Sequence, residues 1–204
     1  MEKKIVRKEI LKLRNNLSQN EIDRKSDIIQ NNLIEYIDKN NIRTLFAYMS
    51  YGSEVQTDII IDYCVSNGVK IALPVITDAD ESIMEFYQIS GNQRLLDNES
   101  FITFLKNGYM NILEPDTNKC KMADFAPQLL IMPGVAFDEE CNRIGYGKGF
   151  YDRYISNNIK SDTELIALAF EEQIVKKIDS FEYDIRPDKI FSELRIIKRN
   201  NNDK

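Results

Sequence analysis

The stretch "QLLIMPGVAFDEECNRIGYGKGFYDRY", residues 128–154, decides the fold that this sequence predicts. Its first six residues form a short apolar run, which is typical of a buried strand. A loop then enters through Pro133 and Gly134, ends in three alternating glycines, and leads into a helix predicted from about Tyr151 to Asn157. A buried strand that passes through a glycine-rich loop into a helix is a building unit of doubly wound α/β sheets.

Short buried strands alternate with helices on both sides of this stretch. Strands are predicted at 43–49, 69–75, 83–89, 164–170 and 194–198, and helices in the N-terminal segment, from Ser18 onward, at 58–67 and at 171–178. We therefore expect an α/β fold: one domain with a doubly wound, mostly parallel sheet flanked by helices, a Rossmann-like three-layer arrangement. The domain is predicted to span 1–198, with 199–204 as a frayed tail.

Local signals predict how the helices begin and which faces they bury. Ser18 and Glu21 have the spacing of a capping box, and Thr57 is expected to cap the helix at 58–67. The N-terminal helix has one predicted apolar stripe, formed by Val6, Ile10, Leu13 and Leu17.

The composition excludes several classes of function. The 204 residues are 43% hydrophobic and 29% charged, which is typical of a soluble globular protein. A net charge of −6 argues against non-specific nucleic-acid binding, which depends on Lys and Arg. The chain has no histidine, which excludes Ser-His and Cys-His nucleophilic machinery and His-ligated metals. The chemistry is left to carboxylates, Lys, Arg, Tyr, backbone amides or a bound cation.

The N-terminus and the cysteines predict a cytoplasmic protein. The first ten residues, MEKKIVRKEI, are charged and lack the apolar segment of a signal peptide. No apolar run approaches the roughly 18 residues needed to span a bilayer. Cys64, Cys120 and Cys141 are scattered without zinc or redox spacing, so we expect reduced thiols.

The alternating glycines at 145, 147 and 149 predict a nest that binds an anion. Without Cβ atoms, their backbone N–H groups can converge on one point, and the following helix adds the positive end of its dipole. Lys148 lies inside this nest, and Arg143 and Arg153 flank it, which favours a phosphate or triphosphate. The stretch matches neither the Walker A pattern nor the dinucleotide fingerprint, because Gly149 and Phe150 stand where each pattern requires another residue. A flexible surface loop with solvated charges is the alternative.

Other charged residues allow two interpretations. Asp152 would either hold Mg²⁺ beside a phosphate or favour the first turn of its helix through the dipole. Lys3 and Arg7 share one face of the N-terminal helix, with Lys4 beside them, and the default interpretation is a solvated basic face. Ligands of doubly wound sheets bind in the loops beyond the carboxyl ends of the strands, here at 50–57, 133–153 and about 171–190.

The block "PGVAFDEECNRIGYGKGFYDRY", residues 133–154, closely resembles the signature of the 5-formyltetrahydrofolate cyclo-ligase family, also called methenyltetrahydrofolate synthetase. Other segments resemble landmarks of the same family in the same order: "KKIVRKEIL" at 3–11, "YMSYGSEVQT" at 48–57, "NILEP" at 111–115 and "YDIRPDKIF" at 183–191. The likeness therefore runs over nearly the full chain.

The resemblance implies an activity and a set of site residues. Members convert 5-formyltetrahydrofolate to 5,10-methenyltetrahydrofolate with ATP and Mg²⁺ and release ADP and phosphate. It implies ATP contacts at Lys3, Lys4, Arg7, Arg143, Ile144, Gly145, Tyr146, Gly147, Lys148, Gly149, Phe150 and Tyr151. It implies folate contacts at Met49, Glu54, Tyr146, Gly147, Lys148, Gly149 and Phe150, and magnesium ligands at Asp152 and Asp184. Many members have Tyr where this chain has Phe150, so ring stacking is expected there without a hydroxyl.

This chemistry suits the residues present. Transfer of a phosphoryl group to the formyl oxygen makes that oxygen displaceable, and N10 of the substrate then attacks, so no histidine is needed. The protein mainly positions the reactants and neutralises charge, and Lys148 and Arg143 are the expected catalytic residues. Met49, Phe150 and Tyr151 suit a flat pterin. Glu54 would accept hydrogen bonds from the pterin or order N10, or else be a surface turn carboxylate.

Two other classes of function stay open. One is a non-catalytic nucleotide- or folate-binding protein on the same scaffold, although the intact Lys148, Asp152 and Asp184 argue against it. The other is a sugar-phosphate isomerase, which would not call for two separated aspartates or a basic N-terminal face. The expected partner is a small-molecule folate, with or without a polyglutamate tail, and neither nucleic acid nor membrane. The chain is expected to be a monomer or a weak homo-oligomer.

Overall fold

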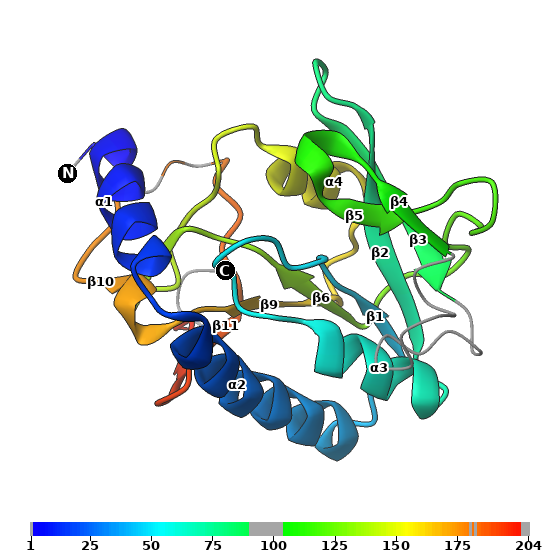
Figure 1. The fold of residues 1–204 in the computed structure, drawn as a ribbon, viewed down its shortest axis with the longest axis horizontal. Helices are drawn as coiled ribbons and strands as arrows, with labels where there is room; N and C mark the ends of the chain where they lie inside the picture. The colour runs from blue at the N-terminus through cyan, green and yellow to red at the C-terminus, as the bar shows by residue number, and fades with distance from the viewer. Residues whose placement is uncertain (1, 90–103, 180, 182, 201–204) are drawn as a thin grey trace.

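The computed structural model describes residues 2–89, 104–179, 181 and 183–200 (Figure 1). The predicted alternation of strands and helices is confirmed, and shorter strands add to it. In chain order the elements are α1 (Lys3–Asn15), α2 (Gln19–Lys39), β1 (Thr44–Phe46), α3 (Asp58–Ser66), β2 (Lys70–Asp78), β3 (Ile83–Ile89), β4 (Leu105–Asn107), the 3₁₀ helix η2 (Tyr109–Asn111), β5 (Leu113–Pro115), β6 (Leu129–Met132), β7 (Ala136–Asp138), β8 (Arg143–Ile144), α4 (Phe150–Asn158), β9 (Glu164–Leu168), the 3₁₀ helix η3 (Glu171–Gln173), β10 (Ile174–Val175), β11 (Lys189–Phe191) and β12 (Ile196–Lys198).

A seven-stranded sheet with the order β12-β11-β9-β6-β1-β2-β3 forms the centre of the molecule. Its five inner strands are parallel, and the edge strands β12 and β3 are antiparallel to their neighbours. Helices α2 and α3 cover one face of the sheet, and α4 lies on the other (Figure 1). The predicted three-layer, mostly parallel α/β fold is confirmed.

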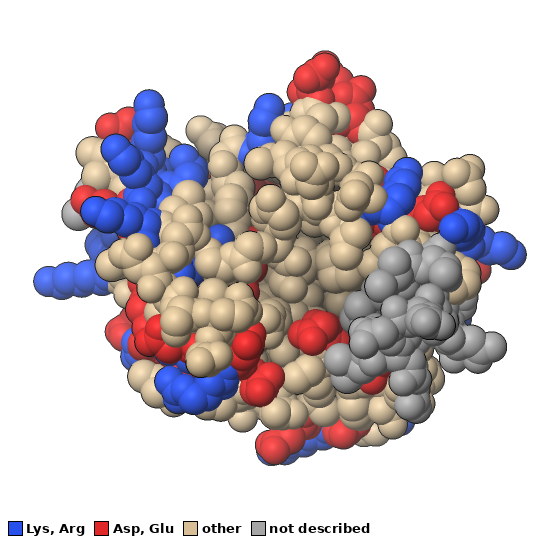
Figure 2. Space-filling model, viewed as in Figure 1, with Lys and Arg blue, Asp and Glu red and all other residues tan. Residues whose placement is uncertain are grey.

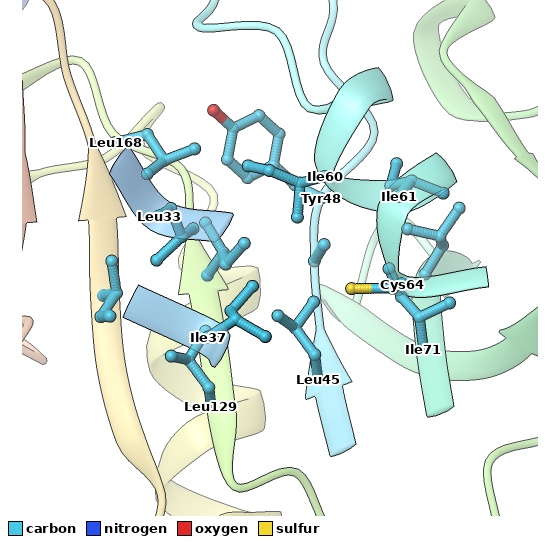
Figure 3. Close-up of a cluster of buried hydrophobic side chains, with 14 of the residues drawn as sticks. Leu33, Ile37, Leu45, Tyr48, Ile60, Ile61, Cys64, Ile71, Leu129 and Leu168 are labelled. Carbon is cyan, nitrogen blue, oxygen red and sulfur yellow. The ribbon is translucent and has the colours of Figure 1, made fainter. Parts of the chain in front are cut away.

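Alternation along the inner strands divides the core between the two faces. Leu129 and Ile131 of β6 join the cluster formed with α2 and α3, whereas Leu130 and Met132 join the cluster that contains Ile155 of α4. Figure 3 shows the first cluster, in which side chains of α2, α3 and the strands interlock. Both faces of these strands are buried, which explains why their sequences are continuous apolar runs.

Two smaller sheets stand apart from the main one. Strands β10, β7 and β8 form a three-stranded sheet, in which β7 and β8 are an antiparallel hairpin. Helix α1 packs on this hairpin and not on the main sheet, through a separate cluster of Val6, Ile10, Val135, Ala136, Ile144 and Ile178. Strands β4 and β5 form the third sheet, beside β2 and β3.

The packing of α1 explains why one sequence prediction is wrong. Leu13, which was expected in the apolar stripe, is 51% exposed, whereas Arg14 is buried. The face of α1 that meets the β7–β8 hairpin runs through Val6, Ile10 and Arg14, a spacing of four residues. The capping box of Ser18 and Glu21 at the start of α2 is confirmed.

Two further local predictions are wrong. The hydroxyl of Thr57 donates a hydrogen bond to the carbonyl of Tyr48 (2.9 Å) and does not cap α3. Residues 171–178 form η3 followed by strand β10, because Ile174 and Val175 pair in parallel with β7. In both places a contact with a distant part of the chain replaces the local one.

The order of the inner strands places a switch point between β1 and β6. The chain leaves β1 toward β2 on one side and later returns to form β6 on the other side. Loops 47–57 and 133–149 therefore leave neighbouring strands at the same edge of the sheet. Among the described residues, no helix combines the length and the apolar character needed to cross a membrane. Arg199 pairs with Asp188, and residues 201–204 of the predicted tail lie outside the described residues.

Candidate active site

The loops that follow β1 and β6 meet at the switch point. The phenolic hydroxyl of Tyr146, in the glycine stretch, donates a hydrogen bond to Oε1 of Glu54 in the other loop. Figure 2 shows this face of the molecule hollowed near its centre, with Lys and Arg side chains gathered over α1 at the left. The predicted phosphate loop and the predicted folate loop therefore lie against each other, although 92 residues separate Glu54 from Tyr146.

The glycine stretch has a left-handed backbone at two of its three glycines. Gly147 has a φ of 103° and Gly149 a φ of 74°, both in the left-handed region that favours glycine. Gly149 is the N-cap residue of α4, so the positive end of that helix lies at the loop. Lys148 is exposed between these two glycines. The loop thus has what an anion nest requires: glycines, a helix N-terminus and an accessible cation.

Helix α1 holds the glycine loop from the side. Nε of Arg7 donates a hydrogen bond to the carbonyl of Gly145 (2.8 Å). The same guanidinium lies so close to Gly147 that a Cβ there would be 3.6 Å from Cζ of Arg7. Lys3 is half-buried and Lys4 is exposed on the same helix. Arg7 therefore contacts the glycine loop, and the binding of ATP by this basic face stays a prediction.

Glu54 is a buried carboxylate with polar partners on both oxygens. Oε1 accepts from Tyr146, and Oε2 accepts from the backbone N–H of Tyr51 (2.9 Å). Burial raises the pKa of Glu54, while the Tyr146 hydroxyl, the Arg14 charge and the Tyr51 N–H oppose that rise. Burial, followed by the Glu54 charge, raises the pKa of the Tyr146 phenol above its ordinary value. Glu54 is therefore not an exposed turn carboxylate. It is buried, and its two oxygens accept the hydrogen bonds that a buried carboxylate needs.

Arg143 is buried beneath the loop and not exposed to a ligand. Its guanidinium donates to the carbonyls of Pro133 (3.0 Å) and Ile185 (3.3 Å) and to Oδ1 of Asp152 (2.7 Å). Only 4% of its side chain is accessible. These contacts favour a positioning role for Arg143, in place of the direct phosphate contact expected from the sequence.

The two predicted magnesium ligands lie close together. Oδ1 of Asp152 accepts a hydrogen bond from the backbone N–H of Ile185 (3.0 Å), the residue that follows Asp184. Oδ2 of Asp184 accepts from Lys3 and from the N–H of Phe181 (2.6 Å). The structure shows hydrogen bonds on Oδ1 of Asp152 and on Oδ2 of Asp184, and binding of a cation by these carboxylates stays a prediction. No cluster of three metal-binding side chains occurs within the described residues.

The sequence predicts that aromatic and apolar side chains contact a folate. Met49 is half-buried against the main core, and the Phe150 ring lies edge-on to Tyr109 with centroids 6.2 Å apart. The Tyr151 hydroxyl is buried without a hydrogen-bond partner among the described residues. Burial raises the pKa of this phenol far above its usual range. Tyr151 therefore acts as a packed neutral ring in this structure, between the two core clusters.

Sequence reasoning missed two residues of this site. Arg14 donates to the Tyr146 hydroxyl (2.8 Å) and to Oγ of Ser53 (3.1 Å), and Tyr109 of η2 contacts Phe150. Arg14 carries a recognisable signal, because it stands four residues after Ile10 on the buried face of α1. Tyr109 carries no such signal, since its contact depends on how η2 packs beside α4.

Comparisons with known proteins agree with one another. The model of the "5-formyltetrahydrofolate cyclo-ligase family" matches residues 1–193. The 5-formyltetrahydrofolate cyclo-ligase of Escherichia coli K12 is 30% identical over 146 residues, covering 70% of this chain and 73% of that protein. The mouse enzyme of the same name is 28% identical over 187 residues, covering 87% of this chain and 86% of that protein. The structure of the Aquifex aeolicus 5,10-methenyltetrahydrofolate synthetase shares the fold, with a TM-score of 0.78, 24% identity and coverage of 98% of this chain and 94% of that chain.

Proposed function

The chain belongs to the 5-formyltetrahydrofolate cyclo-ligase family, and we propose that it closes the ring of 5-formyltetrahydrofolate by using ATP with Mg²⁺. The products are 5,10-methenyltetrahydrofolate, ADP and phosphate. The family establishes that the protein is an enzyme of the cyclo-ligase class, whereas the use of ATP and the course of the reaction are inferred from its residues. The contact between the glycine loop and the Glu54 loop supports this function best, because it brings a phosphate cradle next to a folate-binding loop.

The reaction proceeds in two steps. The formyl oxygen attacks the γ-phosphorus of ATP, and the bond between that phosphorus and ADP breaks. The formyl group becomes an iminium that carries the phosphoryl group on its oxygen. N10 of the substrate then attacks this carbon, the carbon–oxygen bond breaks, and phosphate leaves as N10 loses its proton. The substrate supplies its own nucleophile, which agrees with a chain that lacks histidine.

The protein's part is to position the triphosphate and to neutralise its charge. Lys148 is exposed between two glycines and would reach the terminal phosphates, while the loop amides would hold their oxygens. Lys3 and Arg7 would bind the rest of the triphosphate from α1. Asp152 and Asp184 would hold Mg²⁺, which lowers the negative charge on the phosphates when it is bound. Arg143 acts indirectly, since it holds Asp152 in place.

The folate would lie between the two loops. Glu54 would accept hydrogen bonds from N–H groups of the pterin, and Met49 and Phe150 would contact its flat faces. Phe150 has no hydroxyl, so its contribution is ring contact and the exclusion of water. A low-dielectric pocket strengthens the electrostatic contacts of the phosphoryl group.

The decisive experiment is incubation of the purified protein with 5-formyltetrahydrofolate and MgATP. The methenyl product absorbs in the near-ultraviolet, so its formation is followed directly, with ADP measured in parallel. We expect equal amounts of product and ADP, and no product when ATP or Mg²⁺ is omitted. Binding of folate or nucleotide without product would instead favour a non-catalytic binding protein.

A further inference from the structure

Tyr146 occupies the carboxylate that the folate is expected to use. Its hydroxyl donates to Oε1 of Glu54, and the other carboxylate oxygen is taken by the Tyr51 N–H. Glu54 is 9% exposed and each of its oxygens already accepts a hydrogen bond, so the phenol and a pterin N–H would compete for Oε1. The phenol therefore occupies the position on Glu54 where a pterin N–H would donate its hydrogen bond.

Arg14 keeps the phenol on Glu54. Its NH2 group donates to the Tyr146 oxygen (2.8 Å), its Nε donates to Ser53 Oγ (3.1 Å), and its guanidinium carbon lies 5.7 Å from the centre of the Tyr146 ring. The phenol oxygen thus accepts from a cation and donates to an anion, an arrangement that strengthens both hydrogen bonds. Arg14 itself is 4% exposed and lies on the buried face of α1.

The remainder of Tyr146 is free to move. Its residue is 46% exposed even though its hydroxyl is held between Arg14 and Glu54. It stands between Gly145 and Gly147, and Gly147 already has a positive φ. Rotation of the Tyr146 side chain away from Glu54 breaks its hydrogen bonds with Glu54 and Arg14 and its ring contact with Arg14, while Arg7 keeps its hydrogen bond to Gly145.

We propose that Tyr146 is an internal plug on Glu54, held in place by Arg14, which 5-formyltetrahydrofolate must displace to bind. This inference rests on the proposed function, because it takes Glu54 as the acceptor for the pterin. Arg14 is then a positioning residue that acts on the substrate through Tyr146. The opposite role, in which the Tyr146 hydroxyl binds folate directly, predicts the opposite change in affinity.

The test is calorimetric binding of 5-formyltetrahydrofolate, without nucleotide, to the wild type and to Tyr146→Phe. Removal of the hydroxyl removes the competitor, so the dissociation constant should fall about 3- to 10-fold, the value of one hydrogen bond. An unchanged or weaker affinity overturns the plug. Because most damaging substitutions weaken binding, a gain in affinity is not what general structural damage produces.

A double-mutant cycle tests Arg14. Arg14→Gln should tighten folate binding more in the wild type than in the Tyr146→Phe background, because its action through the hydroxyl is absent from that background, whereas the action of its charge on Glu54 is common to both. Equal effects of Arg14→Gln in both backgrounds would show that Arg14 acts elsewhere. Ser53→Ala is the matched control, because it removes the other hydrogen bond of Arg14 and should leave the affinity unchanged.

The assay of turnover separates the two proposals. If the wild type forms methenyl product but Tyr146→Phe binds folate no more tightly, only the plug is wrong. If Tyr146→Phe binds folate more tightly but no protein forms product, the plug stands and the proposed function is wrong. If the wild type neither binds folate nor turns it over, both are wrong.

Discussion

Arg143 and Asp152 form an ion pair at the base of the glycine loop, with NH2 of the buried Arg143 2.7 Å from Oδ1 of the partly exposed Asp152. One residue lies just before the loop and the other just after it. The same Arg143 also donates to the carbonyls of Pro133 and Ile185, so it joins the end of β6 to the segment before β11. The shape of the loop therefore depends on a cation whose side chain is buried.

Arg143→Met should lower the free energy of unfolding by about 3 kcal/mol, because it leaves a partly buried carboxylate and two carbonyls without their donor. Urea titration followed by circular dichroism measures this change. Retention of wild-type stability with loss of turnover would return Arg143 to the direct catalytic role.

Asp152→Asn should raise the Mg²⁺ concentration needed for half-maximal turnover by about 10-fold, because an amide is a weaker magnesium ligand than a carboxylate. The measurement is initial rate against Mg²⁺ at saturating ATP and folate. Asp162→Asn removes the same charge at an exposed position between α4 and β9 and is the control that should leave the Mg²⁺ requirement unchanged. Equal magnesium curves for Asp152→Asn and the wild type would remove Asp152 from the metal site.

Lys148→Ala should reduce turnover by about 100-fold, the usual loss when one group that stabilises transition-state charge is removed. Stability should change by less than about 0.5 kcal/mol, since Lys148 is exposed. Lys160→Ala removes the same charge beyond the far end of α4 and should leave the rate unchanged. Normal turnover of Lys148→Ala would contradict the assignment of the glycine loop to the phosphates.

Gly134→Ala should destabilise the protein by about 2 kcal/mol, because its new Cβ would lie 2.3 Å from Cζ of the buried Phe137 ring. Thermal unfolding measures the loss. In the Phe137→Leu background the same change should destabilise the protein much less, and an undiminished loss there would show that the clash is not its cause.

Gly149→Ala places its Cβ in open space and should lower the free energy of unfolding by about 1 kcal/mol through its positive φ, with a smaller loss for Gly149→Asn.

Stability should fall as pH rises above about 9, partly because of the buried thiol of Cys64. Burial raises the pKa of Cys64 from an ordinary value of 9.0 to about 12. Between these pH values the thiol ionises in the unfolded state but not in the native state. Ionisation therefore stabilises the unfolded state and lowers the free energy of unfolding. The expected slope is about 1.4 kcal/mol per pH unit. Unfolding free energies at pH 8 and 10 should differ less in Cys64→Ala than in the wild type, and equal differences would contradict the raised pKa.

Local sequence signals predicted the helices and strands that depend mainly on residues close together in the sequence. The capping box of Ser18 and Glu21 and the apolar runs of the inner strands are both as expected. The sequence predicts a helix at 171–178, where the structure has strand β10. This strand depends on pairing with β7, 37 positions earlier in the chain, as in the pair Ile174 and Phe137. Pairing across such a distance overrides the local preference of a short segment.

The site was predictable in its residue types but not in its contacts. The glycines, Lys148 and Glu54 have signals of their own, and loops 50–57 and 133–153 follow from the order of strands. Arg143 is held by Pro133, Asp152 and Ile185, and the joining of Arg14 to Tyr146 depends on where α1 packs, so neither contact follows from a local pattern. The assigned ligand contacts stay predictions until they are measured.

The packing of α1 on residues 135–178 has a consequence for synthesis of the chain. The ribosome releases α1 before the hairpin that buries Val6 and Ile10, which emerges more than a hundred residues later. At translation speeds of about 5–20 residues per second, this amphipathic helix waits several seconds with its apolar side uncovered. A chain arrested before the hairpin should therefore attract chaperones through its first helix, whereas the finished protein should not.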